Sequence, residues 1–390
     1  MAEQKDKHDR YSAWPHRVAL AVCCTAFPLI WVGGLVTTYD AGMAVPDWPS
    51  TYGYNLFLYP WQTWVAGPFD LFIEHGHRLL GATVGLLSIG LVMASWFTPT
   101  HRSVAWGTVG LLLLVVAQGV LGGMRVQLDE RLLALAHACL GLATFAYAAA
   151  VAVVTSRYWH DERRAAAARV MDDAPASGAQ RTGTRLLRLA VLTAGLVYVQ
   201  VILGAMLRHV PVGASPTFFR FAVLFHVVLG CAVLVHVCLL AVRGWSVAQK
   251  KSYVGTPLGA MGLLTIVQIA LGGATWVVKY GFPSWFADWN LAAHFTVHAN
   301  SLWQALITTL HVALGAGILA LSVVLALRTW LFFRLGERIR GRWEASRLGT
   351  HPAARAEVKG LGDGGKAVHG DLRRPGRRHP AQWDSLELRK

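Results

Sequence analysis

The sequence is poor in charged residues. Asp, Glu, Lys and Arg make up 15% of its 390 residues, whereas a soluble domain contains about 25%. Hydrophobic residues make up 54%, and the mean hydropathy is +0.42. A soluble chain of this length needs more polar surface than these residues supply. The composition therefore argues against a soluble protein and predicts an integral membrane protein.

Cysteine is also scarce. The five cysteines all lie inside apolar runs, and no CxxC motif occurs. This pattern argues against a disulfide framework and gives little support to a site for a soft metal. The polar start of the chain leads into an apolar run that no small-residue cleavage site follows. We therefore expect a retained first helix rather than a cleaved signal peptide.

Long apolar segments dominate the rest of the sequence. A helix that spans a membrane needs about 20 mostly apolar residues, and eight segments qualify: 17–39, 72–97, 103–124, 132–155, 186–208, 218–242, 255–278 and 304–328. The polar stretch 156–184 divides them four and four. The prediction is an all-α integral membrane protein with eight transmembrane helices in two four-helix halves, 17–155 and 185–330. We assign the remaining residues to an N-terminal segment (1–16), a linker (156–184) and a basic, mobile tail (331–390).

The net charge of +15 reflects membrane topology rather than a nucleic-acid groove, so no nucleic-acid partner is expected. If the N-terminus is cytoplasmic, the inner segments hold 30 of the 36 Lys and Arg residues and the outer segments hold five. Positive residues favour the cytoplasmic side of a membrane. Both termini are therefore predicted to be cytoplasmic.

The two halves repeat one another. Three pairs of positions match in their local sequence: Gln118 with Gln268, His77 with His226, and His137 with His311. The first two pairs lie about 150 residues apart. The third lies 174 apart, because the loop before the last helix is longer. Since each half has an even number of helices, both halves run in the same direction, which makes this a parallel repeat.

Four histidines are the main candidates for chemistry. Each of them lies near the start of an even-numbered helix, so all four should sit at one depth: His77, His137, His226 and His311. One such histidine could be a hydrogen-bonded packing residue, but four in repeated positions indicate a function. Zinc needs three or four protein ligands. Two histidines per half instead suit haem iron held between facing helices.

Three arginines near the predicted outer surface, Arg78, Arg125 and Arg208, are candidate contacts for haem propionates. Each of them could equally be an ordinary interfacial anchor. Small residues on the odd-numbered helices fit either close helix packing or a smooth wall for a flat cofactor.

Glu74 breaks the repeat. It lies three residues before His77, on the same helix face, whereas Val223 takes the matching place in the second half. The asymmetry suggests that the first half performs chemistry and the second holds a fixed cofactor, although a carboxylate also suits a helix N-terminus. His75 is either a proton partner of Glu74 or, as the pattern favours, a polar residue at a loop edge. The aromatic loop 40–71 either covers the first site or anchors at the membrane interface.

These residues resemble a known family. Glu74-His-Gly-His-Arg78 resembles the E-x-x-H-R motif of the haem A synthase family. The other motifs that fit are Gly33-Gly-Leu-Val-Thr-Thr, Asp47-Trp-Pro, Gln118-x-x-Leu-Gly-Gly and the four spaced histidines. The resemblance covers the eight spans, about residues 17–330. The outer loop lacks the cysteine pair that some members carry, so a thiol-based step there is excluded.

The resemblance implies a membrane oxidoreductase that converts haem O to haem A for cytochrome oxidase. The C8 methyl group would become a formyl group through two hydroxylations and loss of water. Glu74 would be required for activity, His77 and His137 would hold the substrate haem, and His226 and His311 would ligate a b-type haem that relays electrons. Glu74 would move a proton or stabilise a cation.

The resemblance also places the protein in the inner membrane of a bacterium. Its partners would be haem O synthase, cytochrome oxidase subunit I and an unidentified electron donor. Two rival functions use the same histidines or the same repeat. One is a di-haem b-type cytochrome that only transfers electrons, and it would not need Glu74. The other is a transporter or haem-handling chaperone, against which the small number of charges at mid-membrane depth counts.

Overall fold

Helices form almost the whole of the described structure. The computed structural model describes residues 11–171, 180–211, 213–250, 252–286, 288 and 290–347. Eight of its helices are long and apolar enough to cross a membrane. These are α2 (Trp14–Thr38), α4 (Phe69–Phe97), α5 (Arg102–Leu128), α6 (Arg131–Val154), α8 (Gln180–Arg208), α9 (Pro216–Lys250), α10 (Ser252–Tyr280) and α12 (Leu302–Arg347). The predicted all-α membrane fold is thereby confirmed.

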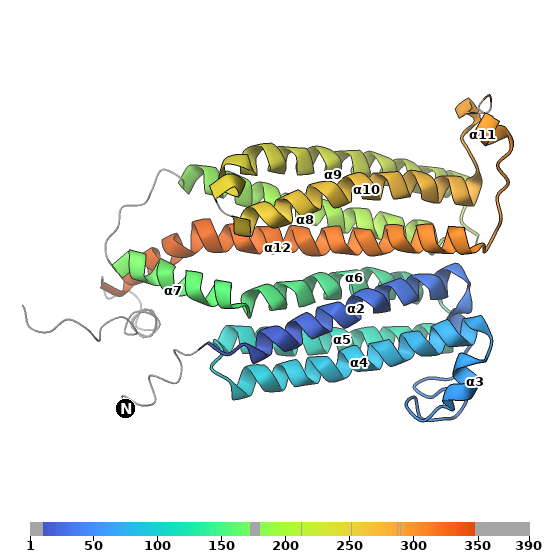
Figure 1. Cartoon of the computed structure of the whole chain (residues 1–390), viewed down its shortest axis with the longest axis horizontal. Coiled ribbons are helices and arrows are strands. Elements are labelled where there is room, and N and C mark those ends of the chain that lie inside the picture. Colours follow the sequence, from blue (N-terminus) through green and yellow to red (C-terminus); the bar gives the residue numbers. More distant parts are fainter. Residues whose placement is uncertain are drawn as a thin grey trace, which may run out of the picture.

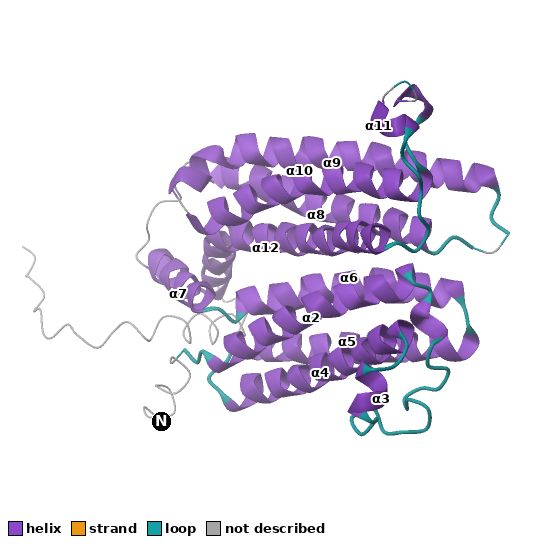
Figure 2. Ribbon diagram, turned by 45° about the vertical axis from the view of Figure 1, so that its right-hand side comes forward, coloured by secondary structure: helices purple, strands orange, loops and turns teal. Residues whose placement is uncertain are grey.

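The eight helices form two groups of four. Helices α2, α4, α5 and α6 make the first half, and α8, α9, α10 and α12 make the second (Figure 1). The halves meet along α12, which packs against α2 and α6. The short helices α3 (Trp61–Val65) and α11 (Asn290–Ala293) lie at one end of the bundle, and α7 (Arg157–Met171) lies at the other (Figure 2). We call these the α3/α11 end and the α7 end.

Proline and left-handed residues set several helix boundaries. Pro15 lies in the first turn of α2, and Pro68 directly precedes α4. Proline suits these places because the first turn of a helix leaves backbone N–H groups unused. At the other boundaries, Asp40 follows α2 with φ 54° and Asp129 ends α5 with φ 49°. Such left-handed residues stop a helix and turn the chain.

Small side chains allow close packing where the halves meet. Ala305, Ala313 and Ala316 on α12 are fully buried. Gly34 on α2 lies so close to α12 that a Cβ atom on it would stand 2.6 Å from Cγ2 of Thr309. Small residues bring membrane helices together because lipid gives little hydrophobic drive for helix association. This contact fixes how the first half stands against the second.

Helices extend into two of the predicted polar segments. Helix α7 occupies much of the predicted linker 156–184, and α12 continues to Arg347, well past the predicted start of the tail at residue 331. An apolarity criterion detects only the membrane-embedded part of a helix, whereas the charged residues that follow can still be helical. Residues 1–10, 172–179 and 348–390 lie outside the described structure, so the prediction of a mobile tail is untested there.

The contact between the halves yields a first prediction. Gly34→Val should destabilise the protein by about 1–3 kcal/mol, because the added side chain overpacks the contact with Thr309. Gly90→Val is the matched control, since a Cβ atom on this α4 glycine meets nothing within 4 Å. Thermal unfolding of the purified protein in detergent should show a lower midpoint for Gly34→Val only. Equal midpoints for the two variants would contradict this packing.

Candidate functional site

The four candidate histidines form two pairs, one in each half. His77 on α4 faces His137 on α6, and His226 on α9 faces His311 on α12. In both pairs the ring centroids are 6.4 Å apart, and the ring planes cross at 73° and 68°. All four lie within about the first three turns of their helices. The repeat seen in the sequence is therefore also a repeat of geometry.

The ring separation suits a single metal atom between the two imidazoles. Two metal–nitrogen bonds of about 2 Å, together with the radii of two rings, add up to roughly 6 Å. Among the described residues, no group of three or more His, Cys, Asp or Glu side chains could hold a metal ion. A metal bound here would take its other ligands from elsewhere, as haem iron takes four from the porphyrin.

A glycine on a neighbouring helix backs each imidazole. An ideal Cβ atom added to that glycine would stand close to Cε1 of the ring. The distance between these two atoms is 2.8 Å for Gly33 and His77, 3.1 Å for Gly122 and His137, 3.1 Å for Gly204 and His226, and 3.2 Å for Gly272 and His311. Any larger residue at these positions would push the ring away. The small residues therefore shape the histidine sites as well as the helix packing.

Glutamine side chains brace three of the four histidine helices. Nε2 of Gln200 donates to the carbonyl oxygen of His226, and Nε2 of Gln268 donates to that of His311, both at 2.9 Å. Gln118 makes the same bond to His137 at 3.1 Å, with its amide oriented to satisfy both ends. Each of these glutamines lies four residues before the glycine that backs the ring, and Leu29 takes this place before Gly33.

The four histidines are partly exposed, but three of their rings have a buried nitrogen without a hydrogen-bond partner. The Nδ1 atoms of His77, His226 and His311 have no hydrogen-bond partner. Unpartnered buried polar atoms are rare and call for an explanation. The two imidazoles of each pair, each backed by a glycine and three of the four with an unpartnered nitrogen, would hold the iron of a haem in each half.

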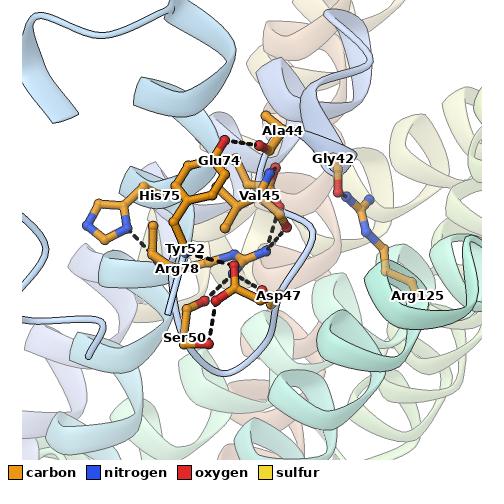
Figure 3. A network of polar contacts seen from close by, with 11 residues as sticks. Gly42, Ala44, Val45, Asp47, Ser50, Tyr52, Glu74, His75, Arg78 and Arg125 are labelled. Carbon is orange, nitrogen blue, oxygen red and sulfur yellow. Dashed lines mark hydrogen bonds and ion pairs between the residues drawn. The ribbon is translucent and has the colours of Figure 1, made fainter. Parts of the chain in front are cut away.

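Glu74, three residues before His77 on α4, lies in a network of polar contacts (Figure 3). Its side chain is buried, with 3% exposure. One carboxylate oxygen accepts from the backbone N–H of Val45 at 2.9 Å, and the other accepts from Arg78 at 2.8 Å. Both oxygens are thus occupied by donors, and the ion pair compensates for the burial of the charge.

Arg78 holds a loop in place. Its two terminal nitrogens donate to the carbonyl oxygens of Val45, Asp47 and Ser50 at 2.6–2.8 Å, besides pairing with Glu74. These bonds leave the terminal nitrogens of Arg78 fully engaged. The prediction that Arg78 contacts a propionate therefore has no support in the geometry. The sequence shows the (i, i+4) pair with Glu74, but it cannot show three loop carbonyls converging on one guanidinium.

Asp47 ties the same loop together. Its carboxylate accepts from the backbone N–H groups of Tyr52 and Gly53 and from the Ser50 hydroxyl. Partial burial raises the pKa of Asp47, but the hydrogen bonds to its charged form outweigh burial and lower the pKa below its ordinary value. Asp47 is thus a structural anion within the loop.

The loop covers the first half. A Cβ atom on Gly123 would lie 2.3 Å from the Trp48 ring, so Trp48 packs directly on α5, one residue from the glycine that backs His137. His75 lies beneath the same loop with 2% exposure, and its Nδ1 is 3.0 Å from the Thr51 hydroxyl. The expectation that His75 is a loop-edge residue is wrong, because Tyr59 and Trp64 enclose its ring.

The other two candidate arginines lie one turn beyond the glycines that back the rings. Arg125 donates to the carbonyl oxygen of Gly42 at 3.1 Å. Arg208 crosses to the other half, where Nη2 donates to the Gly34 carbonyl and the Thr38 hydroxyl, both at 2.9 Å. Both arginines stand at the α3/α11 end, near the histidine pairs. Their contact with propionates stays a prediction.

Comparison with known proteins places the chain in a family. The model of the cytochrome oxidase assembly protein family (COX15-CtaA) matches residues 16–221, more than half of the chain. The chain belongs to this family. Glu74, His77 and His137 lie inside the matched region, and His226 and His311 lie beyond its end. The matched region thus contains the whole first half with the Glu74 network, together with α8 and the start of α9.

A curated relative supports the assignment. The chain is 31% identical over 202 residues to a protein named heme A synthase from Symbiobacterium thermophilum. The match covers 50% of this chain and 60% of that relative's length. No solved structure matches the chain.

The loop yields a prediction about pH. Because the pKa of Asp47 is lowered in the folded protein, its carboxylate stabilises the loop above its ordinary pKa of about 4. That stability is lost as the pH falls through the lowered folded value. Wild type should therefore unfold at a higher temperature than Asp47→Asn at pH 7, and the gap should close below about pH 4. A gap that stays constant down to pH 3 would contradict this role.

Proposed function

We propose that this protein is a haem A synthase, which oxidises a methyl group of haem O to a formyl group. The observation that carries the proposal is the buried Glu74–Arg78 pair, which lies one turn from His77. The second half has the same histidine and glycine geometry but has Val223 in place of Glu74. Family membership and the heme A synthase relative support the same reaction.

The two histidine pairs take different haems in this proposal. His77 and His137 hold the substrate, haem O, because the buried carboxylate and the loop that Arg78 holds both lie in their half. The connection between α2 and α4 covers residues 39–68, whereas α8 and α9 are joined by residues 209–215 alone. His226 and His311 hold a resident haem b, which supplies one-electron transfer when bound. Arg125 stands where it could receive a propionate of the substrate.

Glu74 acts on the substrate as a fixed negative charge. The Val45 amide and Arg78 hold its carboxylate in one position within a buried site. A preorganised charge in a dry site stabilises opposite charge in a transition state without any reorganisation. Taking up a proton would require breaking the pair with Arg78. The network therefore favours stabilisation of positive charge at the reacting carbon over proton transport.

The loop excludes water from the site in the first half. Arg78 and Asp47 hold residues 45–53 over the first half, and Trp48 packs on α5. Excluding water strengthens the electrostatic interactions inside a site and limits side reactions. The same three side chains thus position Glu74 and close the site that the substrate would occupy.

The topology completes the proposal. We infer that the α3/α11 end faces the outside of a bacterial inner membrane and that the termini are cytoplasmic, because the basic residues collect at the α7 end. Haem O would come from its synthase, and haem A would pass to cytochrome oxidase subunit I.

One observation favours a second candidate, a di-haem b-type cytochrome that only transfers electrons. The two histidine pairs have the same ring separation of 6.4 Å, which suits two equivalent haems. The Glu74–Arg78 pair and the loop over it occur beside only one of the two histidine pairs. A cytochrome that only transfers electrons would give them no role.

Extraction of bound pigments tests the proposal. Purified wild-type protein should contain haem B together with haem O, a hydroxylated intermediate or haem A, identified by chromatography and mass. Glu74→Gln should keep haem B and haem O, while the ratio of oxidised product to haem O falls about a hundredfold or more. Asp70→Asn, an exposed carboxylate in the first turn of the same helix, is the matched control and should behave as wild type.

Loosening the loop separates two explanations for that loss. Asp47→Asn weakens the loop without touching Glu74. It should retain more oxidised product than Glu74→Gln. Two equivalents of haem B in every variant, with haem O supplied, would contradict the synthase and leave the electron-transfer cytochrome.

A further inference from the structure

The second half contains buried positive charge without negative charge. Between residues 185 and 330 the sequence has a single carboxylate, Asp288. That residue is exposed and lies in the connection between α10 and α12. The same half places two cations in the last turns of its helices, Arg208 on α8 and Lys279 on α10.

Arg208 has a free donor in a buried place. Nη2 is bound to Gly34 and Thr38 on α2, but Nη1 is buried and has no hydrogen-bond partner. The Arg208 side chain as a whole is only partly buried, so the buried part is the end that carries Nη1. The last turn of a helix carries partial negative charge, which stabilises a cation such as Arg208. It does not supply a partner for Nη1.

The first half does not share this feature. Arg125 also ends its helix in a partly buried place, but Glu74, Asp40 and Asp129 all lie near enough to act on its charge. A buried charge is stable only when it is paired and hydrogen-bonded. A bound anion would supply the partner that Nη1 of Arg208 lacks.

The positions of the donors point to the occupant. Arg208 lies one helical turn from Gly204, which backs His226, and Lys279 lies two turns from Gly272, which backs His311. Two further donors near the pair, the hydroxyls of Thr275 and Thr308, are also buried without partners. These groups gather at the α3/α11 side of the second histidine pair. The two cations offer positive charge and donors only, and the two hydroxyls can add donors of their own, which together suit an anion.

We propose that Arg208 and Lys279 form a carboxylate-binding site that receives the propionates of the porphyrin held by His226 and His311. This inference rests on the proposed function in that it requires a haem in the second half. Arg208 then has two tasks, because one of its terminal nitrogens binds the propionate and the other holds α2 of the first half. Gly33, the neighbour of its backbone acceptor Gly34, backs His77. A haem in the second half thereby steadies the helix that shapes the first site.

Titration of the haem-free protein tests the site. The full-length chain with His77→Ala and His137→Ala keeps only the second pair. It is expressed under haem limitation and titrated with haem b and with haem b dimethyl ester, which has no free carboxylate. Binding is followed by absorption. The parent should bind haem b at least tenfold more tightly than the ester. Arg208→Gln with Lys279→Gln should bind both equally, at the affinity of the ester.

Controls keep the test decisive. Arg220→Gln removes an exposed arginine near the start of α9 and should retain the preference for the free acid. Lys279→Gln alone leaves the Arg208 contacts with α2 intact and should reduce the preference partially, which guards against misfolding of the double variant. An unchanged preference in the double variant, or no preference in the parent, would overturn the proposal.

A phospholipid headgroup offers the same anionic chemistry and is distinguished in the same experiment. If a lipid phosphate occupied the site, the parent would bind acid and ester equally, and phosphorus that copurifies with the parent would be lost from the double variant. That result contradicts the propionate site while leaving the haem assignment intact. If the parent bound neither porphyrin with a bis-imidazole spectrum, the histidine assignment of the proposed function would fail instead.

Discussion

The close contact between each imidazole and a glycine on the next helix is the constraint on which the rest of the structure depends. An imidazole in an apolar bundle must be held by packing, because little else around it is polar. The glycine leaves space for the ring and contacts its edge, so it sets the position of the imidazole. In three of the four cases a glutamine one turn before the glycine donates a hydrogen bond to the histidine's carbonyl oxygen. The spacing of the helices at the α3/α11 end follows from these contacts. So does the 6.4 Å separation that suits a metal between two rings.

The two halves use this shared frame in different ways. The first half adds a carboxylate, a guanidinium and a folded loop, which together make a closed site with fixed charge. The second half adds Arg208 and Lys279, and its only carboxylate, Asp288, is exposed. This charge balance suits a permanently bound anionic cofactor. Leu29 in place of the fourth glutamine is one more difference, because His77 then lacks the brace that holds the other three histidine helices. A duplicated scaffold with unequal additions explains how one chain could separate substrate chemistry from electron supply.

The helices and the histidines could be predicted from the sequence, because membrane thickness fixes the length of an apolar run and a buried histidine needs a reason. Gln200 was missed, although Gln200-Val-Ile-Leu-Gly204 has the same spacing as the two glutamine motifs that were recognised. The full engagement of Arg78 and the burial of His75 could not be predicted. Both depend on how an irregular loop folds back over α4, and irregular loops carry no periodic signal. The extra length of α12 was missed because its charged continuation lies outside the reach of a hydropathy criterion.

The central claim is that each half holds one haem between its own two histidines. The most direct measurement is the number of six-coordinate, bis-imidazole haems per chain, from absorption and electron paramagnetic resonance of protein supplied with haems B and O. Wild type should hold two. His77→Ala with His137→Ala should lose one, and His226→Ala with His311→Ala should lose the other. His236→Ala, which removes an imidazole bonded only to the Ala232 carbonyl of its own helix, should lose neither. A double variant that lost both haems, or that kept both, would contradict the account.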